Sequence, residues 1–243
     1  MKINVEGLPS LKGLNLGVNS SEVNFSIRKL PSLKYLALSM SCTIDENIIS
    51  QLLDQVSHIE HLHLFGYFSH FNLDHLVNLK KLLLLGTINE SFDYDLLKNL
   101  CNQLEILKIV LTNSDVNKLS GHHFPNLQNF CISNCHVKIL KKEFFDRFPM
   151  LQNLFINDCN LEEIENDAFS NLKQLLFLDL SKNLLKFIEK NTFSNLKNLQ
   201  ILDLSKNELT NLNAEFIGVR NSAEIFLEND KFKTFYRYWL KLK

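Results

Sequence analysis

Histidine is the residue type whose spacing comes nearest to a chemical site in this sequence. Five of the eight histidines lie between His58 and His75, and His61 and His63 are separated by one residue. On a β-strand that spacing projects both rings from one face, which is how a zinc site can begin. A zinc ion needs three or four ligands, and no cysteine or acid falls at an outward position of either neighbouring strand. We therefore expect surface histidines that tune a protein contact, with no metal and no cofactor.

Two cysteines occupy equivalent positions in the sequence. The segments Ile132-x-x-Cys135 and Ile156-x-x-Cys159 lie 24 residues apart, which would place the two cysteines one strand spacing from each other, within the range that a disulfide allows. Side chains that run parallel from neighbouring strands favour two free thiols, and a disulfide is the alternative. The cysteines are odd in number and scattered, which favours free buried thiols at all five positions: Cys42, Cys101, Cys131, Cys135 and Cys159.

Catalytic signatures are absent from the sequence. It contains no phosphate-binding glycine loop, no Gly-x-Ser-x-Gly turn and no His-Glu-x-x-His helix. Acids and histidines occur, but no spacing places a nucleophile beside a base. We predict no catalytic residues and no enzyme activity.

Composition and charge are typical of a folded protein with one continuous body. Of the 243 residues, 45% are hydrophobic, and 26 basic residues face 27 acidic ones. The net charge of -1 creates no long-range field for phosphates, so nucleic acid is not an expected partner. The 7 glycines and 4 prolines form no linker, and no run of about 18 apolar residues could span a membrane. We expect one domain over residues 1–243, with its oligomeric state left open.

The spacing Leu-x-x-Leu-x-Leu recurs along the whole chain and organises it. From Leu127 onward the copies start 24 residues apart, and earlier copies run from 20 to 26 residues. Leu-x-Leu alternation indicates a short strand with one buried face, and an asparagine or cysteine then turns the chain, as Asn183 and Asn207 do best. Ten units are predicted to start near residues 11, 33, 59, 79, 104, 127, 151, 175, 199 and 222, after a partial unit at 1–10 and with a frayed end at 228–243.

The second half of each unit carries another apolar ladder. Its members are paired three residues apart, a spacing that suits a short helical or 3₁₀ segment with one edge on the core. The pairs are Phe145 with Phe148, Phe169 with Leu172, Phe193 with Leu196, and Phe216 with Val219. No unit can bury its apolar face alone, so stacked neighbours must form both a parallel sheet and the core.

These units resemble the leucine-rich repeat. From Leu175 to Asn221 they are similar to the typical 24-residue repeat of animal extracellular proteins such as Toll-like receptors and Slit-type ligands, with Leu-Asp-Leu-Ser-Lys-Asn strands and Thr-Phe-Ser-Asn-Leu returns. The resemblance implies an α/β solenoid, a leucine-rich-repeat horseshoe with a parallel concave β-sheet and short helical, 3₁₀ or irregular convex segments. It also implies a non-enzymatic protein-protein interaction scaffold in a receptor-like extracellular recognition domain, as in signal transduction and innate immunity.

The ends of the chain leave two interpretations open. The first residues lack the apolar stretch of a signal peptide, and no cysteine-rich caps flank the repeats. Because Leu8-Pro9-Ser10 precedes Leu11 as Leu30-Pro31-Ser32 precedes Leu33, we expect a fragment of a larger extracellular or cell-surface receptor. The alternative is a cytoplasmic adaptor that presents substrates or assembles complexes, similar to F-box repeat proteins. Triplets that fit the N-glycosylation sequon favour the extracellular interpretation, and they begin at Asn19, Asn24 and Asn89.

Residues between the buried leucines should point outward and form columns across the concave sheet. Aromatic and aliphatic side chains gathered on one face are typical of a protein-binding surface, although scattered surface residues are the alternative. Of two such groups, the first is the expected main contact, because Leu83 and Leu85 are apolar where an unused sheet tolerates polar residues. The first group consists of Tyr35, His61, His63, Phe65, Lys81, Leu83, Leu85, Ile106 and Lys108, and the second of Phe155, Phe177 and Ile201.

Overall fold

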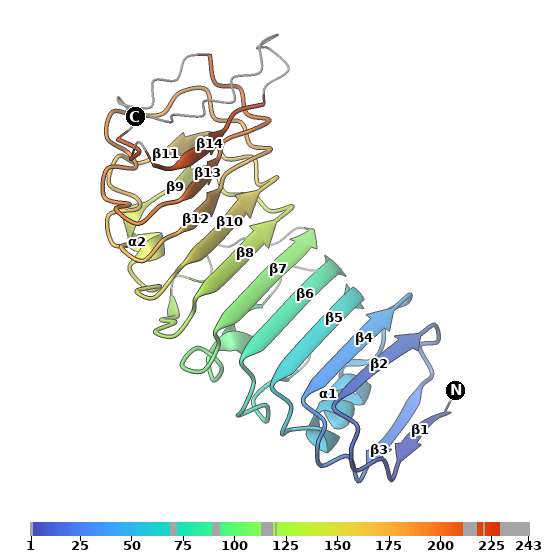
Figure 1. Ribbon diagram of the computed structural model, residues 1–243. Coiled ribbons are helices and arrows are strands. Elements are labelled where there is room, and N and C mark those ends of the chain that lie inside the picture. The colour runs from blue at the N-terminus through green and yellow to red at the C-terminus, as the bar shows by residue number, and fades with distance from the viewer. Residues whose placement is uncertain are drawn as a thin grey trace. The chain divides into compact units, whose positions relative to one another are not determined.

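The computed structural model describes residues 2–68, 72–88, 93–112, 119, 121–210, 218–220 and 222–228 (Figure 1). Asn89, Phe216 and the end of the chain from residue 229 lie outside these ranges. The chain divides into two compact units, unit 1 (Met1–Ser114) and unit 2 (Asp115–Lys243). One domain over residues 1–243 therefore stays a prediction. No helix in the described ranges is both long and apolar enough to cross a lipid bilayer.

Unit 1 builds its sheet from strands that each open one coil. The strand order is β2-β4-β5-β6-β7, the strands are parallel, and equivalent repeat positions face one another, as Leu36, Leu62 and Leu82 do. The strands are β2 (Gly13–Val18), β4 (Tyr35–Met40), β5 (His61–Phe68), β6 (Lys81–Ile88) and β7 (Ile106–Thr112).

Unit 2 repeats the arrangement with shorter strands. Its order is β8-β10-β12-β13-β14, again parallel, and Leu178 pairs with Leu154 on one side and Leu202 on the other. The strands are β8 (Asn129–Ser133), β10 (Asn153–Asn157), β12 (Phe177–Asp179), β13 (Ile201–Asp203) and β14 (Glu224–Phe226). All ten predicted repeats open with a strand, and the predicted α/β solenoid of stacked coils is confirmed.

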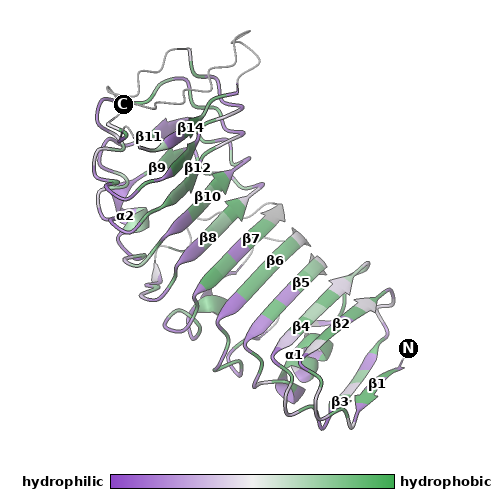
Figure 2. Ribbon diagram, in the orientation of Figure 1, coloured by the Kyte–Doolittle hydropathy of each residue, from purple (hydrophilic) through white to green (hydrophobic). Residues whose placement is uncertain are grey.

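The regularly spaced leucines form the core of both units. Inward residues such as Leu62, Leu107 and Leu154 have no exposed surface, and less hydrophobic residues separate many of them along the strands (Figure 2). The first coil differs, because its three leucines (Leu11, Leu14 and Leu16) stay partly exposed. Strand β2 ends the sheet, so a further coil covers it on one side only.

The return segments mix helices with strands. Helix α1 (Glu46–Gln55) begins after Asp45, whose side chain accepts a hydrogen bond from the Asn47 amide at 2.8 Å. The 3₁₀ segment η1 (Tyr94–Leu97) and helix α2 (Lys142–Phe145) also match the expected return elements. Two further pairs of parallel strands were not expected: β1 (Lys2–Glu6) with β3 (Asn24–Arg28), and β9 (Ile139–Leu140) with β11 (Glu163–Ile164).

Strand β3 forms in a return segment because its residues alternate. Phe25 and Ile27 are buried, whereas Asn24 and Arg28 are exposed, which is the period of a strand and not of a helix. Gln55, at the end of α1, holds this strand in place, since its Oε1 atom accepts a hydrogen bond from the Ile27 amide at 2.7 Å.

The aromatic ladder of the returns is buried as predicted in unit 2. The ring of Phe169 lies with its centroid 5.2 Å from that of Phe145 and 5.6 Å from that of Phe193. Such ring pairs contribute packing energy beyond the area that they bury. The aromatic side chains therefore join successive coils on a side of unit 2 that has little helix.

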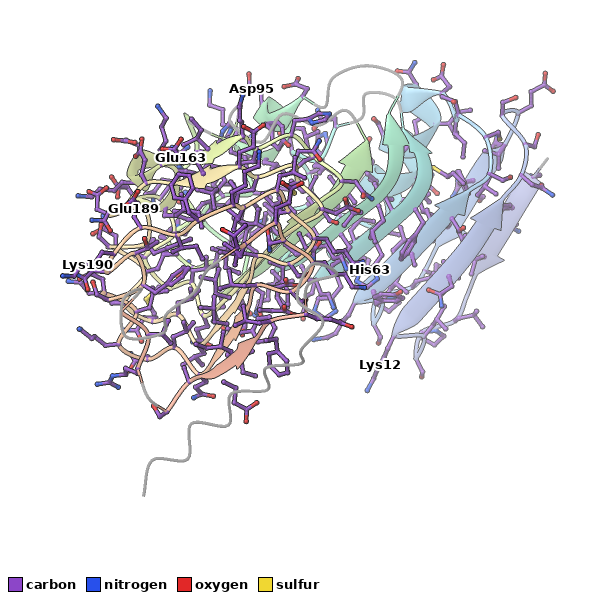
Figure 3. The ribbon with its side chains drawn as sticks, turned by 90° about the horizontal axis from the view of Figure 1, so that it is seen from above. Lys12, His63, Asp95, Glu163, Glu189 and Lys190 are labelled. Carbon is purple, nitrogen blue, oxygen red and sulfur yellow. The ribbon has the colours of Figure 1, made fainter. Side chains whose placement is uncertain are left out.

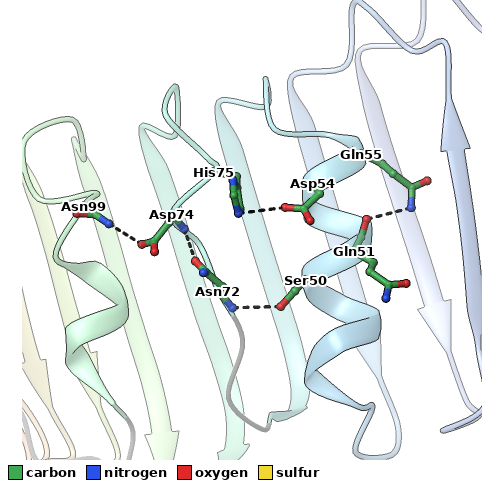
Figure 4. A network of polar contacts seen from close by, with 8 residues as sticks. All are labelled: Ser50, Gln51, Asp54, Gln55, Asn72, Asp74, His75 and Asn99. Atoms are coloured by element: carbon green, nitrogen blue, oxygen red, sulfur yellow. Dashed lines mark hydrogen bonds and ion pairs between the residues drawn. The ribbon is translucent and has the colours of Figure 1, made fainter.

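A polar network links return segments of unit 1 (Figure 4). Ser50 on α1 accepts a hydrogen bond from the Asn72 amide at 3.3 Å, and the Asn72 side chain accepts one from the Asp74 amide at 2.6 Å. The Asp74 carboxylate in turn accepts a bond from Asn99 Nδ2 at 2.7 Å. Because these groups are exposed, the network aligns neighbouring coils more than it stabilises them.

Asn183 satisfies backbone groups at the turn of its coil, as predicted. Its Nδ2 group donates to the Ile156 carbonyl of the preceding coil at 2.7 Å, and its Oδ1 atom accepts from the amides of Cys159 and Leu161 at 3.0 and 3.2 Å. Asn207, one coil later, binds the coil of Asn183 in the same manner, through the Leu180 carbonyl and the Leu185 amide. These buried amides connect the coils of unit 2 on the side where the strands end.

Candidate functional site

The first predicted group of residues comes together on one face of unit 1. Its members alternate with buried leucines along β4 to β7 and are all partly exposed, since they cover one another across the sheet. Figure 3 labels His63, which lies on the other side of the strands from helix α1. We call this surface the unit 1 face, and it consists of Tyr35, His61, His63, Phe65, Lys81, Leu83, Leu85, Ile106, Lys108 and the unpredicted Val110.

The strand register arranges the unit 1 face in three rows. The rows are His61, Lys81 and Ile106; then His63, Leu83 and Lys108; then Phe65, Leu85 and Val110. The third row is apolar throughout, whereas each of the first two contains a lysine. A ligand on this face would therefore meet hydrophobic surface beside positive charge.

Two lysines give the unit 1 face its positive charge. In the described part of the chain neither Lys81 nor Lys108 forms an ion pair, and the outward positions of β2 to β7 that the rows span carry no acid. A lysine just outside the face is neutralised, because Lys34 Nζ lies 2.7 Å from Glu60 Oε1. That hydrogen bond lowers the pKa of the Glu60 carboxyl. The face itself keeps its charge available for an outside group.

His63 lies at the centre of a small aromatic cluster on this face. Its Nδ1 atom is 3.2 Å from the Tyr35 hydroxyl, and the two rings meet edge to face with centroids 4.8 Å apart. Phe65 contacts the other side, with a centroid distance of 6.1 Å. Burial, assisted by the charges of Lys81 and His61, lowers the pKa of His63 to about 4. The ring is therefore neutral at physiological pH, and its buried Nε2 atom has no hydrogen-bond partner among the described residues.

The second predicted group lies in unit 2 and is smaller. The rings of Phe155 and Phe177 have centroids 4.9 Å apart, and Phe177 pairs in register with Ile201. Asp179 and Asp203 follow on the same strands, and each accepts a hydrogen bond at 2.8 Å from the amide two residues later. This group is thus flanked by negative charge, in contrast to the unit 1 face.

The most exposed large apolar side chains are not the predicted ones. Within the described residues they are Leu8, Val77, Met150, Leu184, Phe187 and Phe226. Phe226 extends the second group, because it pairs in register with Asp203. Sequence reasoning missed it since the last repeat is frayed, although the strand pattern around Ile225 places Phe226 at an outward position.

The remaining candidate residues do not assemble into a site. Among the described residues no three His, Cys, Asp or Glu side chains gather as a metal centre, so His61 and His63 gain no further ligand. Of the sequon asparagines, Asn19 and Asn24 are exposed and accessible to modification.

The cysteines are less uniform than predicted. Cys101, Cys135 and Cys159 are buried, but Cys42 and Cys131 are partly exposed, so the prediction of buried thiols is wrong for these two. Alternation along β8 places Cys131 at an outward position, which explains its exposure. The Sγ atoms of Cys135 and Cys159 are unlinked and 2.7 Å apart, closer than side chains running in parallel would be.

The repeats belong to a known family. A family model for the leucine rich repeat matches residues 125–185, 149–209 and 178–232, where the 24-residue period is most regular. Residues 125–232 therefore belong to the leucine-rich-repeat family, and the stacked coils of both units have its fold. No curated protein sequence matches the chain.

Several solved structures share the fold. A chain of the Toll–Spatzle complex of Drosophila aligns with a TM-score of 0.65 at 20% identity over 92% of this chain and 34% of its own. The TLR13–ssRNA13 complex gives 0.55 at 20% identity, with 94% and 45% coverage. A leucine-rich-repeat protein of Leptospira interrogans gives 0.60 at 23% identity, with 90% and 61% coverage. The chain spans from about a third to three fifths of these proteins, and the likeness is one of fold.

Proposed function

We propose that this protein is a non-enzymatic scaffold that binds another protein through the unit 1 face. The observation that carries the proposal is the apolar row of Phe65, Leu85 and Val110 beside two lysines that have no ion-pair partner in the described part of the chain. Partly exposed apolar side chains gathered on one face are a mark of interaction surfaces. Positive charge next to them adds orientation and selectivity for the partner.

The chemistry of the unit 1 face defines the partner that it fits. Leucine or aromatic side chains would cover the apolar row, and a carboxylate would lie over Lys81 and Lys108. His63 lies between these two regions and contributes ring surface without charge, because its Nε2 atom is buried and its low pKa keeps the ring neutral. We therefore propose an acidic segment that also carries large apolar side chains.

Solved structures with this fold include one complex with a protein and one with RNA. The Toll–Spatzle complex pairs such a chain with a protein, and the TLR13 complex contains single-stranded RNA. A net charge of -1 provides no general attraction for phosphates, which favours a protein partner for this chain. A comparison of peptide binding with oligouridine binding distinguishes a protein partner from RNA.

The proposed binding role fits two cellular locations. A receptor-like extracellular recognition domain, with a role in signalling or innate immunity, is favoured by the exposed sequon asparagines Asn19 and Asn24. An intracellular adaptor for substrate recognition or complex assembly is the alternative. Expression through the secretory pathway of an animal cell and peptide mapping would distinguish them, because glycans at both asparagines favour the first version and unmodified asparagines the second.

The binding experiment uses synthetic probes of defined chemistry. The full chain is titrated with labelled peptides of equal length that contain leucine with glutamate, leucine with lysine, or serine with glutamate, and with oligouridine. The leucine–glutamate peptide should bind most tightly. The double variant Leu83→Glu, Leu85→Glu should weaken it by roughly tenfold or more, because it removes apolar surface and neutralises the lysines.

Val77→Glu supplies the matched control. Val77 is 66% exposed and lies in a return segment, so the same type of substitution leaves the unit 1 face intact. A folded double variant that binds with the affinity of the wild type would exclude this face. Tighter binding of oligouridine than of any peptide would contradict the proposed protein partner and indicate a nucleic acid.

A further inference from the structure

Two buried thiols meet at the turns of neighbouring coils in unit 2. The Sγ atoms of Cys135 and Cys159 lie 2.7 Å apart, and the two residues are 2% and 0% exposed. They occupy the same place in successive coils, about 4.8 Å apart along the stack, and a disulfide accepts Cα separations of about 4.4 to 6.8 Å. The spacing between these two coils therefore lies within the range of Cα separations that a disulfide requires.

The next coil makes a stronger contact at the turn than the Cys159 thiol does. At the equivalent turn, the Asn183 amide donates to the Ile156 carbonyl of the preceding coil at 2.7 Å. The Cys159 thiol lies 3.8 Å from the corresponding Ile132 carbonyl and 3.2 Å from the Asn157 carbonyl of its own coil. A thiol is a weak donor, so the hydrogen bonding that this side chain gives across the coils is weaker here than one coil later.

We propose that Cys135 and Cys159 form an inter-coil disulfide when the chain folds in the presence of a small-molecule disulfide such as oxidised glutathione. One cysteine thiolate attacks the small disulfide, forms a mixed disulfide and releases one small thiol. The second cysteine thiolate then attacks the protein sulfur of the mixed disulfide and releases the other small thiol. Two electrons and two protons pass from the cysteines to the small disulfide, which is reduced to two thiols.

Once the coils have formed, the positions of Cys131 and Cys101 keep these two thiols away from the Cys135–Cys159 pair. Cys131 lies at an outward position of β8 in register with Phe155, whereas Cys135 and Cys159 are buried. Cys101 is held inside unit 1, where its thiol donates to the Leu97 carbonyl at 3.1 Å and burial raises its pKa to about 11. A thiol that stays protonated is a poor nucleophile.

Burial also sets when the cross-link can form. A soluble disulfide cannot reach two side chains with almost no exposed surface, so the reaction belongs to folding, before the turns close. The bond would then replace the weak thiol contacts by a covalent connection between coils, and its 24-residue loop would restrict the unfolded chain.

The test is refolding of the full chain from denaturant in reduced and in oxidised glutathione. In oxidised buffer the intact mass should fall by two hydrogen atoms, and peptide mapping should join the peptide that contains Cys135 to the one that contains Cys159. The midpoint of thermal unfolding should rise by about 4 °C or more relative to the reduced protein.

The variant Cys159→Asn is the matched control, because the next coil shows that asparagine fits this position. It should fold and show neither the mass change nor the rise in the unfolding midpoint. The inference is overturned if the oxidised wild-type chain, denatured and alkylated, is labelled at both Cys135 and Cys159, or if mapping joins either one to Cys131 instead. The peptide map of the wild-type chain decides between these outcomes even if the variant fails to fold.

Discussion

Gly66 on β5 and Gly86 on β6 face each other so closely that a Cβ atom added to Gly86 would lie 1.8 Å from the Gly66 carbonyl oxygen. Gly66 stands in the same relation to Met40 on β4, again at 1.8 Å. Both glycines have positive φ angles, +115° and +154°, which side-chain-bearing residues rarely adopt. The close approach occurs just beyond the apolar row of the unit 1 face and fixes how its strands lie together.

Gly86→Ala should therefore destabilise unit 1 strongly. The added methyl group would force the strands apart as well as strain the backbone, and we expect the free energy of unfolding to fall by about 2 kcal/mol or more. Chemical denaturation monitored by circular dichroism measures the loss. Gly17→Ala is the control, because a Cβ there meets nothing within 4 Å, and its unfolding curve should stay close to the wild type.

Asn183→Ala should weaken the stack of unit 2. The substitution leaves the buried amides of Cys159 and Leu161 and the carbonyl of Ile156 without the hydrogen bonds that the side chain provides. We expect a loss of about 3 kcal/mol, since each unsatisfied buried group costs about 1 to 3 kcal/mol. The same substitution at the exposed Asn195 should leave the denaturation midpoint nearly unchanged. Equal midpoints for the two variants would contradict the structural role of Asn183.

Acid should destabilise unit 1 through His63. Burial lowers the pKa of His63 to about 4 in the folded chain, from its ordinary value of 6.5. As the pH falls below 6.5, the unfolded chain takes up a proton that the folded chain does not, so the free energy of unfolding decreases until the pH reaches about 4. Below that value both states are protonated and this contribution changes no further.

Comparison of variants isolates this effect from the titration of carboxylates. Urea unfolding of the wild type and of His63→Gln at pH 7 and pH 5 should show the larger loss in the wild type. His123→Gln, at an exposed position, should follow the wild type. If His63→Gln and the wild type lose the same amount, the His63 ring takes up its proton equally in the folded and unfolded chains.

Sequence reasoning predicted the strands and the core well, because both follow a short period. The leucines at three- and two-residue spacing lie inside from Leu33 to Leu204, and Asn183 and Asn207 make the predicted turn contacts. It was less successful with the return segments. The same apolar content could form the helix at 46–55 or the strand at 24–28, and alternation in the second segment was overlooked.

The candidate site was only partly accessible to prediction. The alternation correctly placed nine residues on the unit 1 face and left out Val110, whose position in the row of Phe65 and Leu85 follows from strand pairing. The extent of exposure could not be predicted, because it depends on how side chains from neighbouring strands cover one another. The prediction of buried thiols failed at Cys131, although alternation along β8 already places it outward, and at Cys42, which lies in a bend after β4.

The amino-acid sequence alone determined the repeat register, the ten strands and the inward leucines, because each coil contacts mainly its neighbours and a local period therefore specifies the stack. The tertiary structure decided which residues of neighbouring coils contact one another. It set the approach of Gly66 to Gly86, the contact of the Cys135 and Cys159 thiols, and the burial that holds His63 neutral. The first two features are contacts between residues 20 and 24 positions apart, and the third depends on side chains of neighbouring coils, so no spacing within one coil encodes them.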